Sequence, residues 1–279
     1  MVSVSGRLAQ VRYAEKRGMS RTKACAVLRV SRSMIGYQQR QPAKDAHLLR
    51  RMRPIARWHP RWGHRLVCGR LDLCGRAVSR KRVLRLWHRA GLQCPVRLIK
   101  RKIRTGERLN PKALQPNDVW CYDFVHDALI NGQTFRGLLV KDEAIGYALA
   151  IEIARSFSSA DVQQVLLRLF RRYGTPRHLR SDNGPEFIAN ALKIWLAQIG
   201  LETVYTEPGK PWQNGASESF NGTFRREVLD AELFYSIGEA CIVSQRWRKL
   251  YNCKRPYSPN NYKPPNTAYH FKARNRAAS

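Results

Sequence analysis

The first part of the chain carries apolar residues at helical spacing, separated by short polar turns. Three short helices are predicted, at residues 6–17, 20–28 and 31–38. Ser20 and Ser31 are suitable N-caps for the second and third. A short helix, a turn and a basic helix are typical of a helix-turn-helix segment, which we place at residues 1–42. An ordinary three-helix bundle is the alternative, because the turn lacks a glycine.

Residues 43–95 repeat this helical pattern and form a second predicted DNA-binding module. Helices are predicted at residues 47–55, where Pro54 perturbs the end, and at 62–73 and 80–90. Ser79 caps the last helix and Gly91 ends it. The outer face of this last helix is basic and suited to phosphate contacts. Its candidate DNA-binding residues are Arg80, Lys81, Arg82 and Arg85.

A basic linker without apolar periodicity is predicted at residues 96–117, which contain Pro111 and Pro116. Its stretch with Lys100, Arg101 and Lys102 could lie along a DNA backbone.

From residue 118 the pattern changes to apolar, β-branched and aromatic runs with strand periodicity. Strands are predicted at 119–129, 134–140, 147–153, 178–181 and 202–206, and helices at 158–173, 186–199, 214–230 and 237–252. Three strands followed by alternating helices and strands indicate an α/β RNase H-like core of the integrase type, at residues 118–253. The Pro/Asn-rich, basic tail at 254–279 shows no clear contribution to a core.

The net charge of the chain indicates what kind of partner it binds. The chain of 279 residues has 51 Lys plus Arg against 20 Asp plus Glu, a net charge of +31, which indicates a polyanionic partner. Residues 1–110 carry +25 of this charge and residues 111–279 carry +6. We therefore expect a nucleic-acid-binding part followed by a catalytic part. Neither a long apolar run nor a signal-type N-terminus occurs, so we expect a cytoplasmic protein without membrane contact.

Seven scattered cysteines and no CxxC pair favour free thiols over a disulfide framework. The histidines and cysteines between His59 and Cys94 raise the question of zinc. Their spacing matches no zinc module, so we do not predict such a site.

Three acids stand out by their positions. Asp123 lies inside the first strand, Asp182 directly follows the fourth, and Glu218 lies near the start of a helix. A carboxylate within a buried strand is costly unless it is paired or binds a metal. Two Mg²⁺ ions held by such a cluster could drive in-line attack on a phosphodiester, and Mn²⁺ can take their place. Asp123 would bridge both ions, and the other two acids would complete one site each.

The helix of Glu218 presents further polar residues at matching spacing. Asn214, Glu218, Asn221 and Arg225 share one face. Arg225 could grip a DNA phosphate beside the metals, and Asn214, Asn221 and Lys210 of the preceding loop are further candidate DNA contacts.

These motifs resemble a known family. The carrying segments are VWCYDFV, RSDNGPEFIANALKIWLAQIGLE, PGKPWQNGASESFNGTFRREVLD and WRKLYNCKRP. They resemble the DDE transposases of bacterial insertion sequences, specifically the second-reading-frame (OrfB) proteins of the IS-three family, whose core is retroviral-integrase-like. The resemblance covers nearly the whole chain. It implies that Asp123, Asp182 and Glu218 are catalytic metal ligands and that Arg225 occupies the family's basic position. It also implies cleavage of element ends and strand transfer into DNA.

The implied partners are double-stranded DNA (element ends and target), further copies of the chain on that DNA, and an upstream-frame protein. Two segments depart from the family pattern: residues 141–146, which read KDEAIG, and Tyr257, where a histidine is usual. The alternative functions are a catalytically idle DNA-binding regulator, or partial transposase product needing fusion to an upstream frame, and an RNase H-type nuclease acting on RNA–DNA hybrids.

Overall fold

The computed structural model describes residues 4–35, 41–93, 113–181, 190–205 and 215–269. The chain divides into two compact units, residues 1–51 and 52–279, and each is described by itself. Within the described ranges no helix is both long and apolar enough to cross a bilayer. The described cysteines are all free thiols.

The first unit is a small helical cluster. It contains α1 (Val4–Lys16), α2 (Arg21–Val27) and a 3₁₀ turn, η1 (Arg32–Met34). Its core is formed by Val11, Ala24, Cys25 and Val30. Ser20 stands at the N-cap of α2, but its side chain makes no capping hydrogen bond. Of the helix predicted at 31–38, the structure describes only η1, and residues 36–40 lie outside the described part.

Helix α3 (Gln41–Trp58) begins six residues earlier than predicted and continues past Pro54. Proline removes one backbone donor from a helix interior. Burial of Met52 on this helix offsets part of that loss, because the side chain is fully excluded from solvent.

Helices α4 (His64–Leu73) and α5 (Arg80–Arg89) complete the helical part of the second unit. Their buried sides are formed by Val67, Leu71, Val83, Leu86 and Trp87. The predicted end of α5 is confirmed: Gly91 has a φ of +65°, a left-handed conformation that glycine adopts without strain.

A five-stranded sheet forms the centre of the α/β core, as predicted. The strands are β1 (Val119–Ala128), β2 (Thr134–Asp142), β3 (Ala148–Ala154), β4 (His178–Ser181) and β5 (Glu202–Tyr205). Their order is β3-β2-β1-β4-β5. The first three strands pair antiparallel, whereas β4 pairs parallel to β1 and β5 parallel to β4. This is the strand arrangement of an RNase H-like fold.

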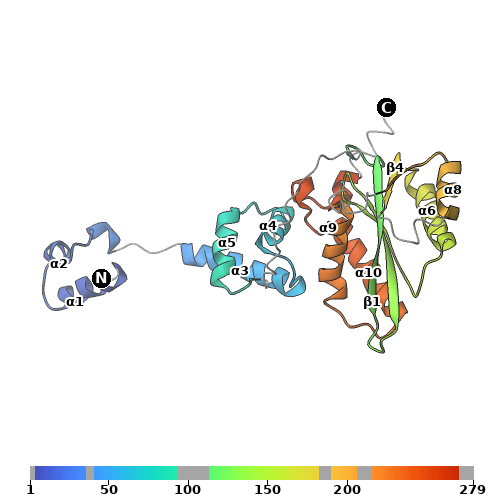
Figure 1. The fold of residues 1–279 in the computed structure, drawn as a ribbon. Coiled ribbons are helices and arrows are strands. Elements are labelled where there is room, and N and C mark those ends of the chain that lie inside the picture. Colours follow the sequence, from blue (N-terminus) through green and yellow to red (C-terminus); the bar gives the residue numbers. More distant parts are fainter. Residues whose placement is uncertain (1–3, 36–40, 94–112, 182–189, 206–214, 270–279) are drawn as a thin grey trace. The chain divides into compact units, whose positions relative to one another are not determined.

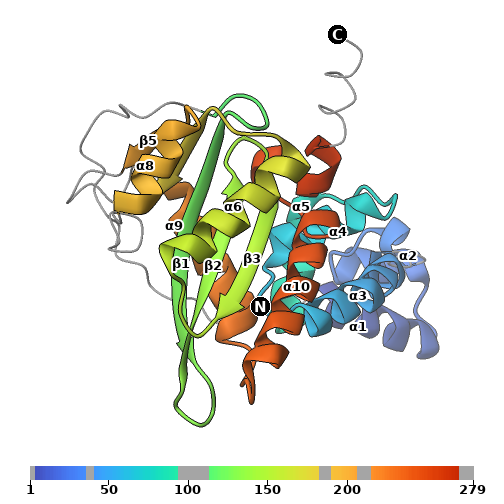
Figure 2. The ribbon, with the colours of Figure 1, turned by 90° about the vertical axis from the view of Figure 1, so that its right-hand side faces the viewer.

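Helices cover both faces of this sheet. They are α6 (Ser159–Tyr173), α8 (Asn190–Gln198), α9 (Gly215–Phe224) and α10 (Ile237–Cys253). Helices α6 and α8 lie on one face, and α9 and α10 on the other (Figures 1 and 2). Side chains of β1 alternate between the two: Tyr122 packs toward α6 and α8, and Val125 toward α9 and α10.

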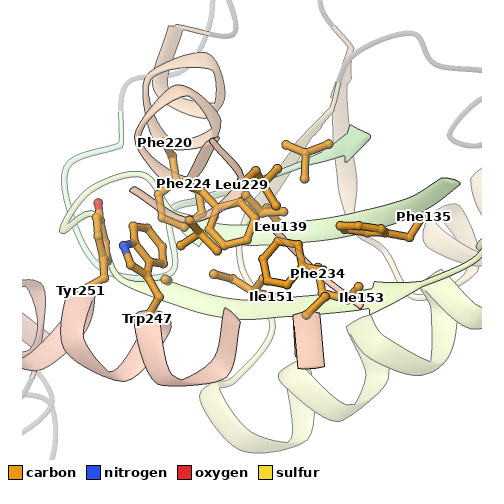
Figure 3. Close-up of a cluster of buried hydrophobic side chains, with 14 of the residues drawn as sticks. Phe135, Leu139, Ile151, Ile153, Phe220, Phe224, Leu229, Phe234, Trp247 and Tyr251 are labelled. Atoms are coloured by element: carbon orange, nitrogen blue, oxygen red, sulfur yellow. The ribbon is translucent and has the colours of Figure 1, made fainter. Parts of the chain in front are cut away.

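An aromatic cluster joins α9 and α10 to the sheet (Figure 3). Phe220 and Phe224 come from α9, and both rings contact Trp247 of α10 at centroid distances of 5.9 and 5.2 Å. A π-helical turn, η3 (Arg225–Leu229), follows α9 and carries Leu229 into the same cluster. The cluster therefore fixes which side of α9 faces the sheet.

The prediction that the tail contributes nothing to a core is wrong for its first part. Pro256, Pro264 and Pro265 are buried. The ring of Tyr257 lies so close to Gly146 that a Cβ there would come within 2.3 Å of it. Low apolar content concealed this packing, because prolines and tyrosines provide the buried surface.

Replacing Phe224 by alanine tests the aromatic cluster. Phe224 is fully buried, so we expect Phe224→Ala to lower the free energy of unfolding by about 3–5 kcal/mol, measured by urea denaturation. Leu233→Ala is the matched control, because Leu233 is 76% exposed and its loss should change stability by less than about 0.5 kcal/mol. Equal effects of the two substitutions would contradict this packing.

Candidate active site

Asp123 lies in the middle of β1, opposite Leu139 of β2, on the sheet face covered by α9 and α10. At least two donors bind its carboxylate. The backbone N–H of Phe124 donates to Oδ1 at 2.7 Å, and the side-chain amide of Asn221 donates to Oδ2 at 2.7 Å. Hydrogen bonds to an ionised acceptor are stronger than those between neutral groups. The compensation predicted for a carboxylate inside a strand is therefore supplied in part by α9.

A second hydrogen bond ties the same helix to the same strand. Nη2 of Arg225 donates to the backbone carbonyl of His126 at 2.6 Å. Asn221 and Arg225 are four residues apart, and their partners on β1 are three apart, so helix and strand run in the same direction. The prediction that Asn221 and Arg225 share a face is confirmed by these bonds. The guanidinium has five N–H groups, so this bond leaves donors for a further partner.

Glu218 lies one helical turn before Asn221, about 4.5 Å along the axis. It is exposed to solvent, and within the described residues it makes no hydrogen bond or ion pair. Its rotation about the axis is fixed by Phe220 and Phe224, which anchor the opposite side of α9 in the aromatic cluster. The fold therefore brings the helix of Glu218 against the strand of Asp123.

Several predicted site residues lie outside the described part of the chain. They are Asp182, Lys210, Asn214, Lys100, Arg101 and Lys102. Among the residues that are described, no three histidines, cysteines or acids form a metal-binding group. The described part of the candidate site is thus Asp123, Glu218, Asn221 and Arg225.

The predicted basic face of α5 is partly engaged within the protein. The guanidinium of Arg80 lies 4.6 Å from the ring centroid of Tyr262, a cation–π contact with the tail. Lys81 and Arg85 are exposed, whereas Arg82 is half-buried. These last three remain candidates for phosphate contacts.

Sequence reasoning treated Asn221 as a DNA contact and missed its bond to Asp123. The available signal was its position three residues after Glu218 on a shared helix face. A hollow of about 600 Å³ lies elsewhere, on α6, lined by Gln164, Leu167, Arg168, Arg171 and Arg172. Helix α6 covers the opposite face of the sheet from Asp123, so this hollow is separate from the candidate site.

Comparison with known proteins gives two matches to integrase core domain families, one over residues 113–211 and one over residues 199–265. The chain is 35% identical over 269 residues to the 31.7 kDa protein of insertion element IS407 from Burkholderia multivorans, covering 95% of each chain. It is 35% identical over 255 residues to the 39.2 kDa protein of IS476 from Xanthomonas euvesicatoria, covering 91% of this chain and 73% of that one. Against the transposase InsD of IS2 from Escherichia coli the identity is 28% over 229 residues, covering 76% and 74%.

Among solved structures, the chain is similar to the HTLV-2 integrase catalytic core domain in complex with magnesium, with a TM-score of 0.45 and 18% identity, covering 56% of this chain and 99% of that one. It is also similar to a chain of the simian T-cell lymphotropic virus intasome in complex with PP2A regulatory subunit B56 gamma, with a TM-score of 0.48 and 18% identity, covering 73% of this chain and 71% of that one.

A double-mutant cycle tests the bond between Asn221 and Asp123. We expect Asp123→Ala and Asn221→Ala to couple by about 1–2 kcal/mol in the free energy of unfolding, because the carboxylate and the amide bond directly. Asp127 is the control, since it lies on the same strand and its carboxylate accepts the N–H of Ala128. A coupling between Asp123 and Asn221 no larger than that between Asp127 and Asn221 would refute the interaction.

Proposed function

Because the chain belongs to the insertion-element transposases with an integrase core domain, we propose that it cleaves the ends of its element and joins them to DNA by two-metal-ion phosphodiester chemistry. The observation that carries this proposal is the hydrogen bond from Asn221 to Asp123. It places the acid of β1 against the helix of the exposed acid Glu218.

The donor set fits Mg²⁺, for which Mn²⁺ can substitute. Carboxylate oxygens are the hard ligands that Mg²⁺ prefers, and one or two of them suffice when substrate phosphate and water supply the rest. The side-chain Oδ1 of Asn221 is buried without a hydrogen-bond partner among the described residues, so it could accept from a metal-bound water. When bound, the two ions activate the attacking oxygen and stabilise the leaving oxygen.

Asp182 is the proposed third ligand. Strands β1 and β4 are parallel, and their pairing runs from Val119–His178 to Cys121–Arg180. Asp182 directly follows β4, the parallel neighbour of β1, and this position in the sequence supports its proposed role beside Asp123. The proposed cluster therefore draws one acid from β1, one from the residue that directly follows β4, and one from α9.

The protein's own residues would orient and hold the reactants. Asn221 and the N–H of Phe124 each donate to one oxygen of Asp123 and so fix the orientation of its carboxylate. Arg225 lies on the same side of its helix as Asn221 and would contact a DNA phosphate with its remaining N–H groups. No protein nucleophile is required, because water or a DNA 3′-hydroxyl attacks the phosphorus directly.

The regions before the core would hold the DNA. We assign this role to the helix-turn-helix-like segment 1–42, the module 43–95 and the linker 96–117, which carry most of the net positive charge. Asn214 and Lys210, with Lys100, Arg101 and Lys102, complete the proposed contacts. Further copies of the chain and an upstream-frame protein are the proposed partners in a cytoplasmic complex on double-stranded DNA.

Asp182→Asn tests the catalytic assignment. Loss of a metal ligand removes several kcal/mol of transition-state stabilisation, so we expect cleavage and joining of labelled element-end duplexes to fall roughly a thousandfold. Binding of the same duplex should persist. Glu232→Gln is the control, because Glu232 is an exposed acid outside the cluster. Full activity of Asp182→Asn would contradict the catalytic assignment. If the wild-type protein binds the duplex but releases no 3′-hydroxyl, either alone or fused to the upstream-frame protein, the result would favour a DNA-binding regulator.

Salt titration tests the DNA-binding role of α5. If Lys81 and Arg85 each neutralise one phosphate, replacing either by alanine should lower the slope of log affinity against log salt concentration by about one. Lys249→Ala is the control, because Lys249 is exposed on α10. An unchanged slope in both α5 variants would remove this helix from the DNA interface.

A further inference from the structure

Lys141 is a charged side chain in the interior of the catalytic core. It lies on β2 opposite Cys121, on the sheet face covered by α9 and α10, and is only 3% exposed. Burial, the largest single effect, lowers the pKa of Lys141, while Tyr251, Tyr257, Cys121 and the hydrogen bond to Tyr257 raise it; the net shift is upward, so the ammonium keeps its proton. A buried charge is costly unless it is paired.

Aromatic rings and one hydroxyl are the partners of this ammonium. Nζ lies 5.6 Å from the ring centroid of Phe220 and 5.5 Å from that of Tyr257. It donates one long hydrogen bond, 3.4 Å, to the hydroxyl of Tyr257. Burial raises the pKa of Tyr251 to about 12, so that phenol is neutral at physiological pH. Within the described residues, Lys141 forms no ion pair.

The nearby carboxylates are committed to other donors. Asp142 points to the other side of β2 and accepts the backbone N–H groups of Asn117 and Ile145. Glu143 pairs with the buried guanidinium of Arg180. These acids therefore leave the charge of Lys141 without a directly bound counter-ion.

The carboxylate of Glu227, from η3, is also occupied. It accepts two hydrogen bonds from Nε and Nη2 of Arg255, at 3.0 and 2.8 Å, and one from the indole of Trp247 at 3.0 Å. The Glu227–Arg255 pair is neutral as a unit. The net charge of the region around Lys141 is therefore positive.

A cavity of about 160 Å³ lies at this side chain. It is lined by Leu66, Lys141, Ser219, Phe220, Thr223, Tyr251, Arg255, Tyr257 and Ser258. One water molecule takes up about 30 Å³, so the cavity has room for a small polyatomic ion. Hydroxyl groups from α9, α10 and the tail line it beside the ammonium: Thr223 donates to the carbonyl of Ser219, whereas those of Ser219, Tyr251, Tyr257 and Ser258 can donate to an anion.

The strand lysine and the tail tyrosine meet at this cavity, because Lys141 and Tyr257 both line it. Gly146 has a φ of +72° and leaves the space that the Tyr257 ring fills. The glycine therefore admits the ring whose hydroxyl bonds the lysine.

We propose that this cavity is an anion site that binds a phosphate group through Lys141, with Tyr257 and the surrounding hydroxyls as further donors. The shared chemistry is a tetrahedral oxyanion, either free phosphate or a phosphodiester of bound DNA. The cavity is lined by α9, which also carries Glu218, and by Leu66 of α4. A bound phosphate would thus neutralise the buried charge and link the catalytic helix, the tail and the helical module.

Titration of the full chain with inorganic phosphate tests the site. The thermal midpoint and calorimetric binding would be measured at constant ionic strength, with EDTA present so that metal chemistry plays no part. We expect saturable stabilisation of the wild type and phosphate binding that is roughly tenfold to a hundredfold weaker in Lys141→Met. Methionine keeps the length and apolar character of the stem but removes the charge.

Lys249→Met is the matched control, because it removes an exposed lysine from α10 and corrects for general screening of the high net charge. Tyr257→Phe is the second variant: it keeps the ring over Gly146 but removes the hydroxyl, and should weaken phosphate binding while the fold is preserved. Equal responses to phosphate in the wild type, Lys141→Met and Tyr257→Phe would overturn the proposal, as would the absence of any saturable response.

Duplex-binding measurements distinguish the two sources of the anion. If the occupant is a phosphodiester, phosphate should compete with duplex binding, and Lys141→Met should weaken duplex binding and lower its salt slope by about one. If the occupant is free phosphate, duplex binding should be the same in Lys141→Met and in the wild type while the phosphate response is lost. Both results support the site, and neither depends on cleavage or joining activity.

Discussion

The hydrogen bond between Asn221 and Asp123 is the constraint on which the candidate active site depends. Asp123 is half-buried in the middle of its strand, and a neighbouring backbone N–H and an amide from α9 both donate to its carboxylate. The same bond sets the height of α9 along β1 and thereby places Glu218. Arg225 reinforces it by bonding a carbonyl three residues further along the strand.

The aromatic cluster at α9 fixes the rotation of this helix about its axis, as well as its position along β1. Phe220 and Phe224 pack into the cluster with Trp247, so Asn221 and Arg225, on the neighbouring part of the helix surface, are turned toward β1. The π-helical turn after Phe224 closes with a hydrogen bond of 2.7 Å from the N–H of Asp230 to the carbonyl of Arg225. Such turns are frequent at functional sites, and here the irregularity begins at the residue that bonds β1.

Much of the core could be predicted from the sequence because its signals are local. Strand alternation and Gly91 as a helix stop each depend on a few neighbouring residues, and each is found as predicted. The helix predicted from residue 158 is also found, and Ser158 forms a full capping box with Asp161 at its start. Helix α3 and the tail were mispredicted because tertiary packing decides them. Likewise, the acids could be singled out from their positions, whereas the bond between Asn221 and Asp123 joins residues ninety-eight positions apart.

Two oppositely charged groups, Asp123 and Lys141, lie on the same sheet face in different surroundings. Asp123 is negative, held by two oriented donors and set beside an exposed acid, an arrangement suited to recruiting cations. Lys141 lies on the adjacent strand and is positive. Aromatic rings and a hydroxyl group contact its ammonium, and these groups carry no charge. Helix α9 lies against both, through Asn221 on one side and Phe220 on the other. A shift of α9 would therefore alter the surroundings of the acid and of the cation together.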